Sequence, residues 1–226
     1  MKRVFLLLLI VGLTTTAFSR KTESRQVSDF TGIDASYCFD ITVNKGNSES
    51  LAIEADDEVM PYVRSEVKNG VLRLYLDKND LQNTGNLKAV ITMKNLDNVS
   101  LSGACKLTAN NLFTPDNFKA DCSGISSITV NVKTDQLNVE LSGASVVNLT
   151  GSANDLKMNA SGISVIKAEN LTVKNADVRV SEMCKATVNV TNHLKAEASG
   201  GASITYKGSP SVDSNSNDMS EIKKMQ

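Results

Sequence analysis

Residues 118–130 read FKADCSGISSITV, and the same pattern returns at 137–149 as LNVELSGASVVNL and at 156–168 as LKMNASGISVIKA. The Ser-Gly step in these segments recurs every 18 to 21 residues through the second half of the chain: Ser102, Ser123, Ser142, Ser161 and Ser199, with Ser181-Glu182 filling the one gap. A unit repeated at such a period indicates a solenoid, in which each coil packs only on its neighbours. We therefore expect the stacking of coils to determine the fold.

Apolar and polar residues alternate on both sides of the Ser-Gly step. The position three before the serine is held by Ala120, Val139, Met158, Val178 and Ala196. A period of two is typical of strands with one buried face, so the step is a bend between two short strands, where glycine adopts a conformation that a Cβ would penalise. The pattern predicts an all-β fold, a single-stranded, right-handed parallel β-helix (β-solenoid) with Val139, Met158 and Val178 as vertical neighbours.

The rest of the chain lacks this interval but still has strand-like segments. We expect residues 20–226 to form one β-solenoid domain, because no Pro- or Gly-rich linker interrupts them. Residues 26–98 are predicted to be an irregular N-terminal β segment that packs on or caps the early coils. Residues 99–208 are predicted to form regular coils of about 19 residues, and 209–226 a degenerate last coil or cap. Both ends need a cover, because an end strand exposes unpaired backbone groups.

Residues 1–19 have the features of a secretory signal peptide. Lys2 and Arg3 precede an apolar run over residues 4–13, and residues 17–19 form a small-residue cleavage site. The run is too short to span a bilayer, and no cysteine follows it as a lipoprotein anchor. We expect an exported protein, periplasmic or at the cell surface or secreted, with no integral membrane segment after signal removal. Its formal net charge of −1 becomes about −3 without the signal, so nucleic acid is not an expected partner.

The outward strand positions are where a functional site would lie. They carry Lys119/Asp121, Asn138/Glu140, Lys157/Asn159, Asp177/Arg179 and Lys195/Glu197. An acid and a base two residues apart on one face can pair within and between strands. We interpret this face as solvated and charge-neutralised, with a binding surface as the alternative.

A catalytic site would leave a different pattern. A polysaccharide lyase or hydrolase on a β-helix needs acids, or a base with Arg or Lys, converging on one patch. The sequence shows no such cluster and no calcium-binding Gly-Gly-x-Gly-x-Asp repeat, and the single histidine, His193, lies in a turn. We predict no catalytic, cofactor-binding or metal-binding residue and no cofactor.

Exposed aromatic rings would be the usual mark of sugar binding, and they are scarce here. The chain has no Trp, and Phe118 and Tyr206 fall in inward-facing columns. Tyr37, Tyr62 and Tyr75 are the rings without such a place, and all three lie in the N-terminal segment. They are the candidate ligand-facing patch.

Four cysteines in an exported chain raise the question of disulfides. Cys122 falls in a core column, while Cys105 and Cys184 share a column but lie four coils apart, beyond disulfide reach. Cys38 can approach Cys105 only if a first coil around Ser36 stacks directly on the coil that contains Cys105. Whether these two pair stays open, and small buried thiols are the simpler interpretation.

Several short motifs, taken in order, resemble a known family. They are residues 30–36 (FTGIDAS) and 40–43 (DITV), then 66–74 (EVKNGVLRL), the Ser-Gly-Ile-Ser and Ser-Gly-Ala-Ser steps, and finally 206–210 (YKGSP) and 222–224 (IKK). Together they are similar to the head GIN domain family of putative autotransporter adhesins, a domain of unknown function common in Bacteroidetes. The likeness covers nearly all of the mature chain. It implies a β-helical exported domain of the cell envelope with an adhesin-like role, and it transfers no catalytic residue.

Three functions remain open from the sequence. The first is a non-catalytic, exported, adhesin-like module that contacts an envelope protein or glycan through its faces. The second is a carbohydrate-active β-helix enzyme. The third is a structural spacer or homo-oligomerising module.

Overall fold

The computed structural model describes residues 20–77, 85, 87–217 and 219–225. The predicted signal peptide, residues 1–19, lies outside the described residues. Apart from a short 3₁₀ helix, η1 (Met60–Tyr62), the regular structure described is all strand: β1 (Arg20–Arg25), β2 (Gly32–Ala35), β3 (Phe39–Lys45), β4 (Ser50–Asp56), β5 (Val63–Lys68), β6 (Val71–Leu76), β7 (Leu87–Met93), β8 (Asn98–Leu101), β9 (Lys106–Phe113), β10 (Asn117–Cys122), β11 (Ser127–Leu141), β12 (Val146–Ala160), β13 (Val165–Val180), β14 (Lys185–Ala198), β15 (Ser203–Gly208), β16 (Ser211–Ser216) and β17 (Glu221–Lys224).

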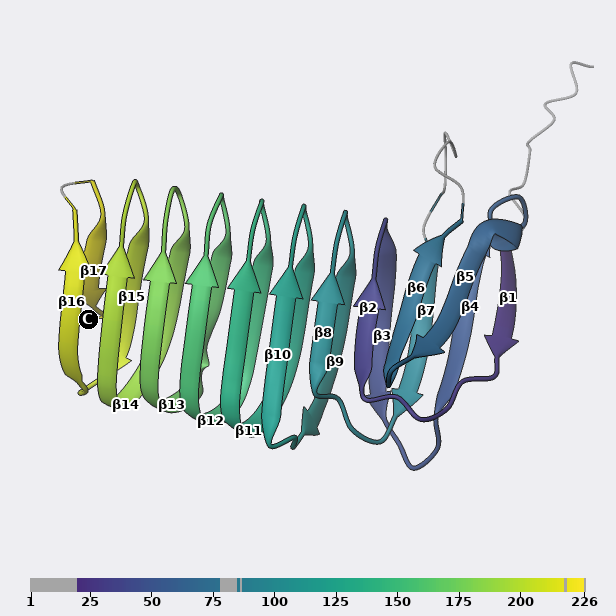
Figure 1. Ribbon diagram of the computed structural model, residues 1–226, viewed down its shortest axis with the longest axis horizontal. Helices are drawn as coiled ribbons and strands as arrows, with labels where there is room; N and C mark the ends of the chain where they lie inside the picture. Colours follow the sequence, from purple (N-terminus) through teal and green to yellow (C-terminus); the bar gives the residue numbers. More distant parts are fainter. Residues whose placement is uncertain (1–19, 78–84, 86, 218, 226) are drawn as a thin grey trace, which may run out of the picture.

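The coils stack in parallel along one axis (Figure 1), which confirms the predicted all-β parallel β-solenoid. The second half of β11 pairs with β10, and its first half pairs with β9, so a long strand turns a corner and serves two sheets. We call these the front sheet (β6, β2, β8, β10, the second halves of β11–β14, and β16) and the back sheet (β7, β3, β9, the first halves of β11–β14, β15 and β17). Val139 pairs with Met158, and Met158 pairs with Val178, as the repeat predicts.

The Ser-Gly steps form the tight bends between the two sheets. Gly143 has φ +83°, and an added Cβ would lie 2.5 Å from the carbonyl oxygen of Gly124 in the preceding coil. That carbonyl accepts a 2.8 Å hydrogen bond from the backbone N–H of Ala144. Glycine is needed here both for its backbone conformation and for the close approach of two coils.

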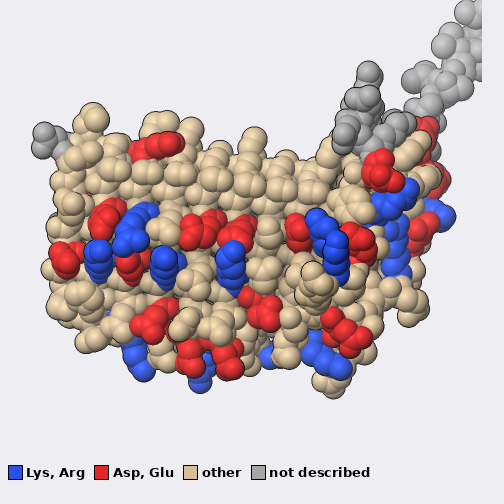
Figure 2. Space-filling model, in the orientation of Figure 1, with Lys and Arg blue, Asp and Glu red and all other residues tan. Residues whose placement is uncertain are grey.

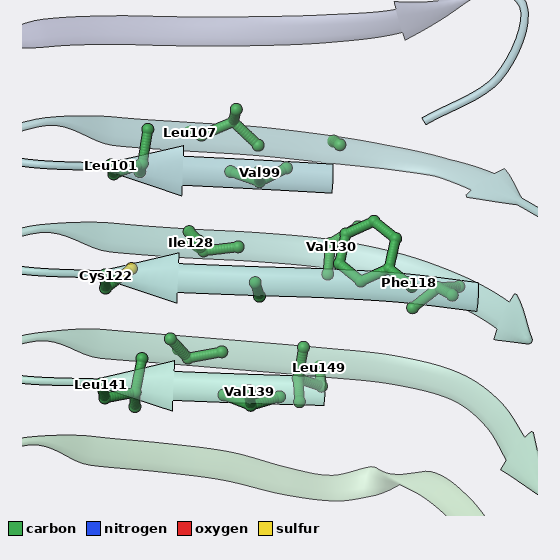
Figure 3. Close-up of a cluster of buried hydrophobic side chains, with 14 of the residues drawn as sticks. Val99, Leu101, Leu107, Phe118, Cys122, Ile128, Val130, Val139, Leu141 and Leu149 are labelled. Carbon is green, nitrogen blue, oxygen red and sulfur yellow. The ribbon is translucent and has the colours of Figure 1, made fainter. Parts of the chain in front are cut away.

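The interior of the solenoid is a set of apolar columns. Figure 3 shows side chains of consecutive coils above one another, with Leu101, Cys122 and Leu141 in one column and Leu107 and Ile128 in another. All five are buried. Because each coil alone would leave this surface exposed, the columns stabilise the fold only when coils are stacked.

The N-terminal segment caps the early coils, as predicted, but it does so in an order that the repeat did not indicate. β2 and β3 form a coil that pairs with β8 and β9 on one side and with β6 and β7 on the other. The chain therefore completes one coil, leaves it, and adds the coil of β6 and β7 on its outer side before returning to β8. Antiparallel strands then cover that end, with β5 on β6, β4 on β7 and β1 on β4.

At the opposite end, the last two strands continue the stack. β16 pairs in parallel with β14, and β17 pairs in parallel with β15. Ile222 lies opposite Ile204 and packs against the core.

The four cysteines carry no disulfide. The first coil does stack directly on the next one, but the register places Phe39, and not Cys38, beside Cys105. Cys105, Cys122 and Cys184 are buried. Burial raises the pKa of Cys122 to about 12 and that of Cys105 to about 11.

We expect this burial to make the protein less stable at alkaline pH. Above pH 9, the ordinary value for a thiol, the unfolded chain loses the Cys122 proton while the folded chain keeps it, so stability falls as pH rises. The loss from pH 8 to pH 10.5 should be about 2 kcal/mol for this thiol. Urea unfolding under reducing conditions measures it. Cys122→Ala should show a smaller loss, and an equal loss in both proteins would contradict the assignment.

Candidate functional site

A long groove runs along the front sheet beside the bends. It is open, has a volume of about 800 Å³, and extends from Ser100 to Asn217. Its residues form three parallel rows. The floor consists of the residues just before each bend, Leu101, Cys122, Leu141, Ala160, Val180 and Ala198, and the wall toward the bends consists of Ser123, Ser142, Ser161, Ser181, Ser199 and Asn217.

The other wall carries carboxylate, carboxamide and guanidinium groups. Its members are Asp121, Glu140, Asn159, Arg179, Glu197 and Asn215. Strand alternation places them outward, because the residues directly before and after each of them in its strand face the core. Coils repeat at about 4.8 Å, so the wall offers a polar group at each such step along the axis.

The polar groups of this wall are held in pairs. Lys119 Nζ lies 2.9 Å from Asp121 Oδ2, and Asn159 Nδ2 donates a 2.8 Å hydrogen bond to Glu140 Oε1. Figure 2 shows the resulting rows of opposite charges across the front sheet. The face is thus polar with little net charge.

Arg179 connects the acids and bases of two neighbouring coils. Its Nη2 lies 2.8 Å from Asp177 Oδ2 and its Nε lies 3.3 Å from Glu197 Oε2, while Lys195 Nζ lies 3.1 Å from Glu197 Oε1. The hydrogen bond from Lys195 lowers the pKa of Glu197. A carboxyl group with a lowered pKa stays ionised, so it is suited to accepting hydrogen bonds and not to acting as a general acid.

A second, smaller hollow lies on the front sheet at the side away from the bends. It has a volume of about 450 Å³, with Leu137, Leu156, Ala176 and His193 among its lining residues. His193 is exposed, and its Nδ1 lies 2.9 Å from Ser211 Oγ. Among the described residues, no three His, Cys, Asp or Glu side chains gather as a metal site.

The three tyrosines of the predicted patch have different surroundings. Tyr75 lines a hollow of about 510 Å³ together with Ser36 and Arg73. Tyr37 is half-buried, occupies the glycine position of the first bend with φ +87° and packs against the core. Tyr62 ends η1, and its carbonyl accepts a hydrogen bond from the backbone N–H of Asp77. Ligand binding by this patch stays a prediction.

The alternation in the sequence predicts every residue of the charged wall except Asn215, but it does not predict the groove. The missing signal is the relative height of the three rows. The floor residues, such as Leu141 and Ala160, are buried and face the core, whereas the serine row and the charged wall on either side face outward.

A comparison with protein families agrees with the fold and the repeat. A family model described as "Putative auto-transporter adhesin, head GIN domain" matches residues 29–210. The chain belongs to this family. A comparison with curated proteins returned no match.

Solved structures similar to this head GIN domain protein include a putative adhesin from Bacteroides fragilis, at 25% identity with a TM-score of 0.85, covering 92% of this chain and 98% of that one. A putative adhesin from Parabacteroides merdae has 19% identity and a TM-score of 0.72, over 92% and 96% of the two chains. A putative lipid binding protein from Parabacteroides distasonis has 18% identity and a TM-score of 0.74, over 92% and 97%. The last two likenesses concern the fold alone. The family and its neighbours are consistent with an adhesin-like, non-catalytic protein.

Proposed function

We propose that this protein is an exported, non-catalytic, adhesin-like module of the cell envelope, in the periplasm or at the surface, and that the front-sheet groove binds an extended envelope glycan. One observation carries the proposal: the groove continues across successive coils with the same three rows of residues. A ligand that repeats along its length can form equivalent contacts at each step. The predicted signal peptide and the family's description support export.

The chemistry of the walls favours sugar hydroxyls. Each hydroxyl both donates and accepts hydrogen bonds, and the groove offers acceptors such as Glu140 and donors such as Asn159, with a row of serine hydroxyls opposite. The paired charges favour a glycan of low net charge. Without aromatic platforms beside the groove, each sugar would bind weakly, and affinity would come from contacts summed along the chain.

An extended peptide suits the groove less well. Peptides often bind by adding a strand to a free sheet edge. The strands beneath the groove lie inside the sheet, where the second half of β12 pairs with β11 on one side and with β13 on the other. Their backbone groups are therefore already bonded.

Catalysis is not favoured by the carboxyl groups of the groove. Asp121 and Glu197 are each paired with a lysine, and the pKa of Glu197 is lowered, whereas a glycosidase needs a carboxylic acid whose pKa is raised. The third function left open, a spacer, would not need a continuous groove.

Substitution in the middle of the groove tests the proposal. Glu140→Ala with Asn159→Ala removes both partners of one hydrogen bond, so neither is left unpaired. On a glycan array followed by calorimetry, we expect the double variant to bind the selected glycan at least tenfold more weakly. The matched control is Thr129→Ala with Asn148→Ala, which removes a 3.2 Å side-chain hydrogen bond on the back sheet and should change affinity less than twofold. Unchanged binding by the groove variant, or no glycan bound by the wild type, would refute it.

A further inference from the structure

The bend edge carries a row of apolar side chains that face solvent. The residue after the glycine position is Ile125, Ala144, Ile163, Met183, Gly201 and Met219 in six successive bends. We call this row the apolar ridge. Its large members are far from buried: Ile125 is 73% exposed, Ile163 and Met183 are each 58%, and Met219 is 77%.

The fold does not require apolar residues at these positions. The bends are held by backbone hydrogen bonds between coils, such as Ile163 N–H to the Gly143 carbonyl at 2.7 Å. In each bend, the residue that packs toward the core is the one after the ridge residue, for example the buried Ser145 and Ser164. Since neither the backbone nor the core uses the ridge side chains, their exposure points to contact with something outside the chain.

The surroundings of the ridge are almost free of charge. Among the described residues of these bends, Glu182 is the only charged side chain. Figure 2 shows an uncharged band along this edge, above the charged rows of the front sheet, with one acidic patch. The nearest charges on the two sheets are of both signs, so no basic rim favours an anionic surface.

The shape of the ridge selects the partner. Coils repeat at about 4.8 Å, so the ridge is about 24 Å long and one residue wide, with an area on the order of 250 Å². A stable protein dimer needs about 800 Å² on each partner, with complementary shape. A straight row of projecting Ile and Met side chains needs no complementary pocket to enter a planar, deformable layer.

We propose that the bend edge rests on the surface of a lipid bilayer, with Ile125, Ile163, Met183 and Met219 inserted between headgroups of no net charge. The solenoid axis then lies parallel to the membrane. The proposal is independent of what the groove binds.

Vesicle binding tests this directly. The chain is used without residues 1–19, because that apolar segment would bind lipid by itself, and every described strand is kept since β1 begins at Arg20. The probe is phosphatidylcholine vesicles in a co-sedimentation assay. Ile125→Ser with Ile163→Ser and Met183→Ser should weaken partitioning at least tenfold without changing the melting temperature, because the three side chains are exposed. Raising the salt concentration should leave wild-type binding unchanged.

The matched control changes exposed apolar residues elsewhere. Val90 and Leu112 are 46% and 44% exposed and lie on the back-sheet strands β7 and β9. Val90→Ser with Leu112→Ser should reduce partitioning less than twofold. An equal reduction in both variants would overturn the proposal, as would the absence of wild-type binding to these vesicles.

Fluorescence gives a second readout at a single site. The chain has no Trp, so Ile163→Trp introduces the only indole, and Leu112→Trp is its control. Vesicles should shift the emission of the Trp at 163 to shorter wavelength, and brominated lipid should quench it, while the Trp at 112 should not respond. A ridge-dependent dimer in sedimentation velocity, without a vesicle response at 163, would overturn the proposal in favour of a second copy.

Discussion

Replacing Gly143 by alanine is expected to lower the free energy of unfolding by about 3 kcal/mol. The φ of +83° alone costs a residue with a Cβ about 1–2 kcal/mol. The new Cβ would also lie 2.5 Å from the Gly124 carbonyl oxygen, which must move away. Moving it weakens the hydrogen bond that this oxygen accepts from Ala144 N–H, worth about 1 kcal/mol. Urea unfolding followed by circular dichroism measures the change.

Two control positions separate these contributions. Gly70 has φ +75° in the hairpin between β5 and β6, with no atom within 4 Å of an added Cβ. Gly70→Ala should therefore cost only about 1–2 kcal/mol. Glu182 holds the glycine position of its bend with φ +64° and already carries a Cβ, so Glu182→Ala should change stability by less than about 0.5 kcal/mol. Equal losses at Gly143 and Gly70 would show that the contact between coils has no cost.

The regular half of the fold was predictable because a solenoid repeats one local rule. Val139, Met158 and Val178 occupy the same place in each repeat, so their stacking follows from alignment of the sequence with itself. The buried face follows from alternation within each strand. Neither inference needs information about contacts between distant, dissimilar segments.

The N-terminal half was less predictable because its neighbours are set by pairings that no repeat marks. β2 lies beside β6 and β8, which begin 39 and 66 residues after it. Tyr37 shows the consequence. It occupies a glycine position, but the coil on its outer side joins β6 to β7 through residues 77–86 and not through a four-residue bend. The repeat therefore has no counterpart bend from which the residue at this position could be predicted.

The candidate site was predictable in its residues but not in its shape. Alternation identifies Glu140, Asn159 and Arg179 as outward-facing. A groove depends on the relative heights of neighbouring rows, and only the structure shows the buried floor row between two outward-facing rows. Alignment of the repeats with one another also shows that Ile125, Ile163 and Met183 share one position after the repeated step. Only the structure shows that these side chains are exposed.

Deletion of one complete coil, residues 143–161, is expected to leave a folded protein. Ser142 then precedes Gly162, and β13 can stack on β11 in the register that β12 had, with Ile128 beside Ile166 and Val139 beside Val178. In a solenoid each coil contacts only its neighbours, so removing one coil joins equivalent surfaces. The circular dichroism per residue should stay the same, and the urea m value should fall by about a tenth, in proportion to the surface buried.

Deletion of half a coil, residues 143–152, should instead prevent folding. Only residues 153–155 would join Ser142 to Leu156, and the four extended steps between these two Cα atoms reach at most about 14 Å. Leu156 must lie beside Leu137 at the far end of a strand segment of about 16 Å, so the second half of β12 cannot reach its place. The shorter deletion should thus be the more damaging one, seen as loss of the β signal and of a cooperative urea transition. A whole-coil deletion as damaging as the half-coil deletion would mean that the coils do not act as interchangeable units.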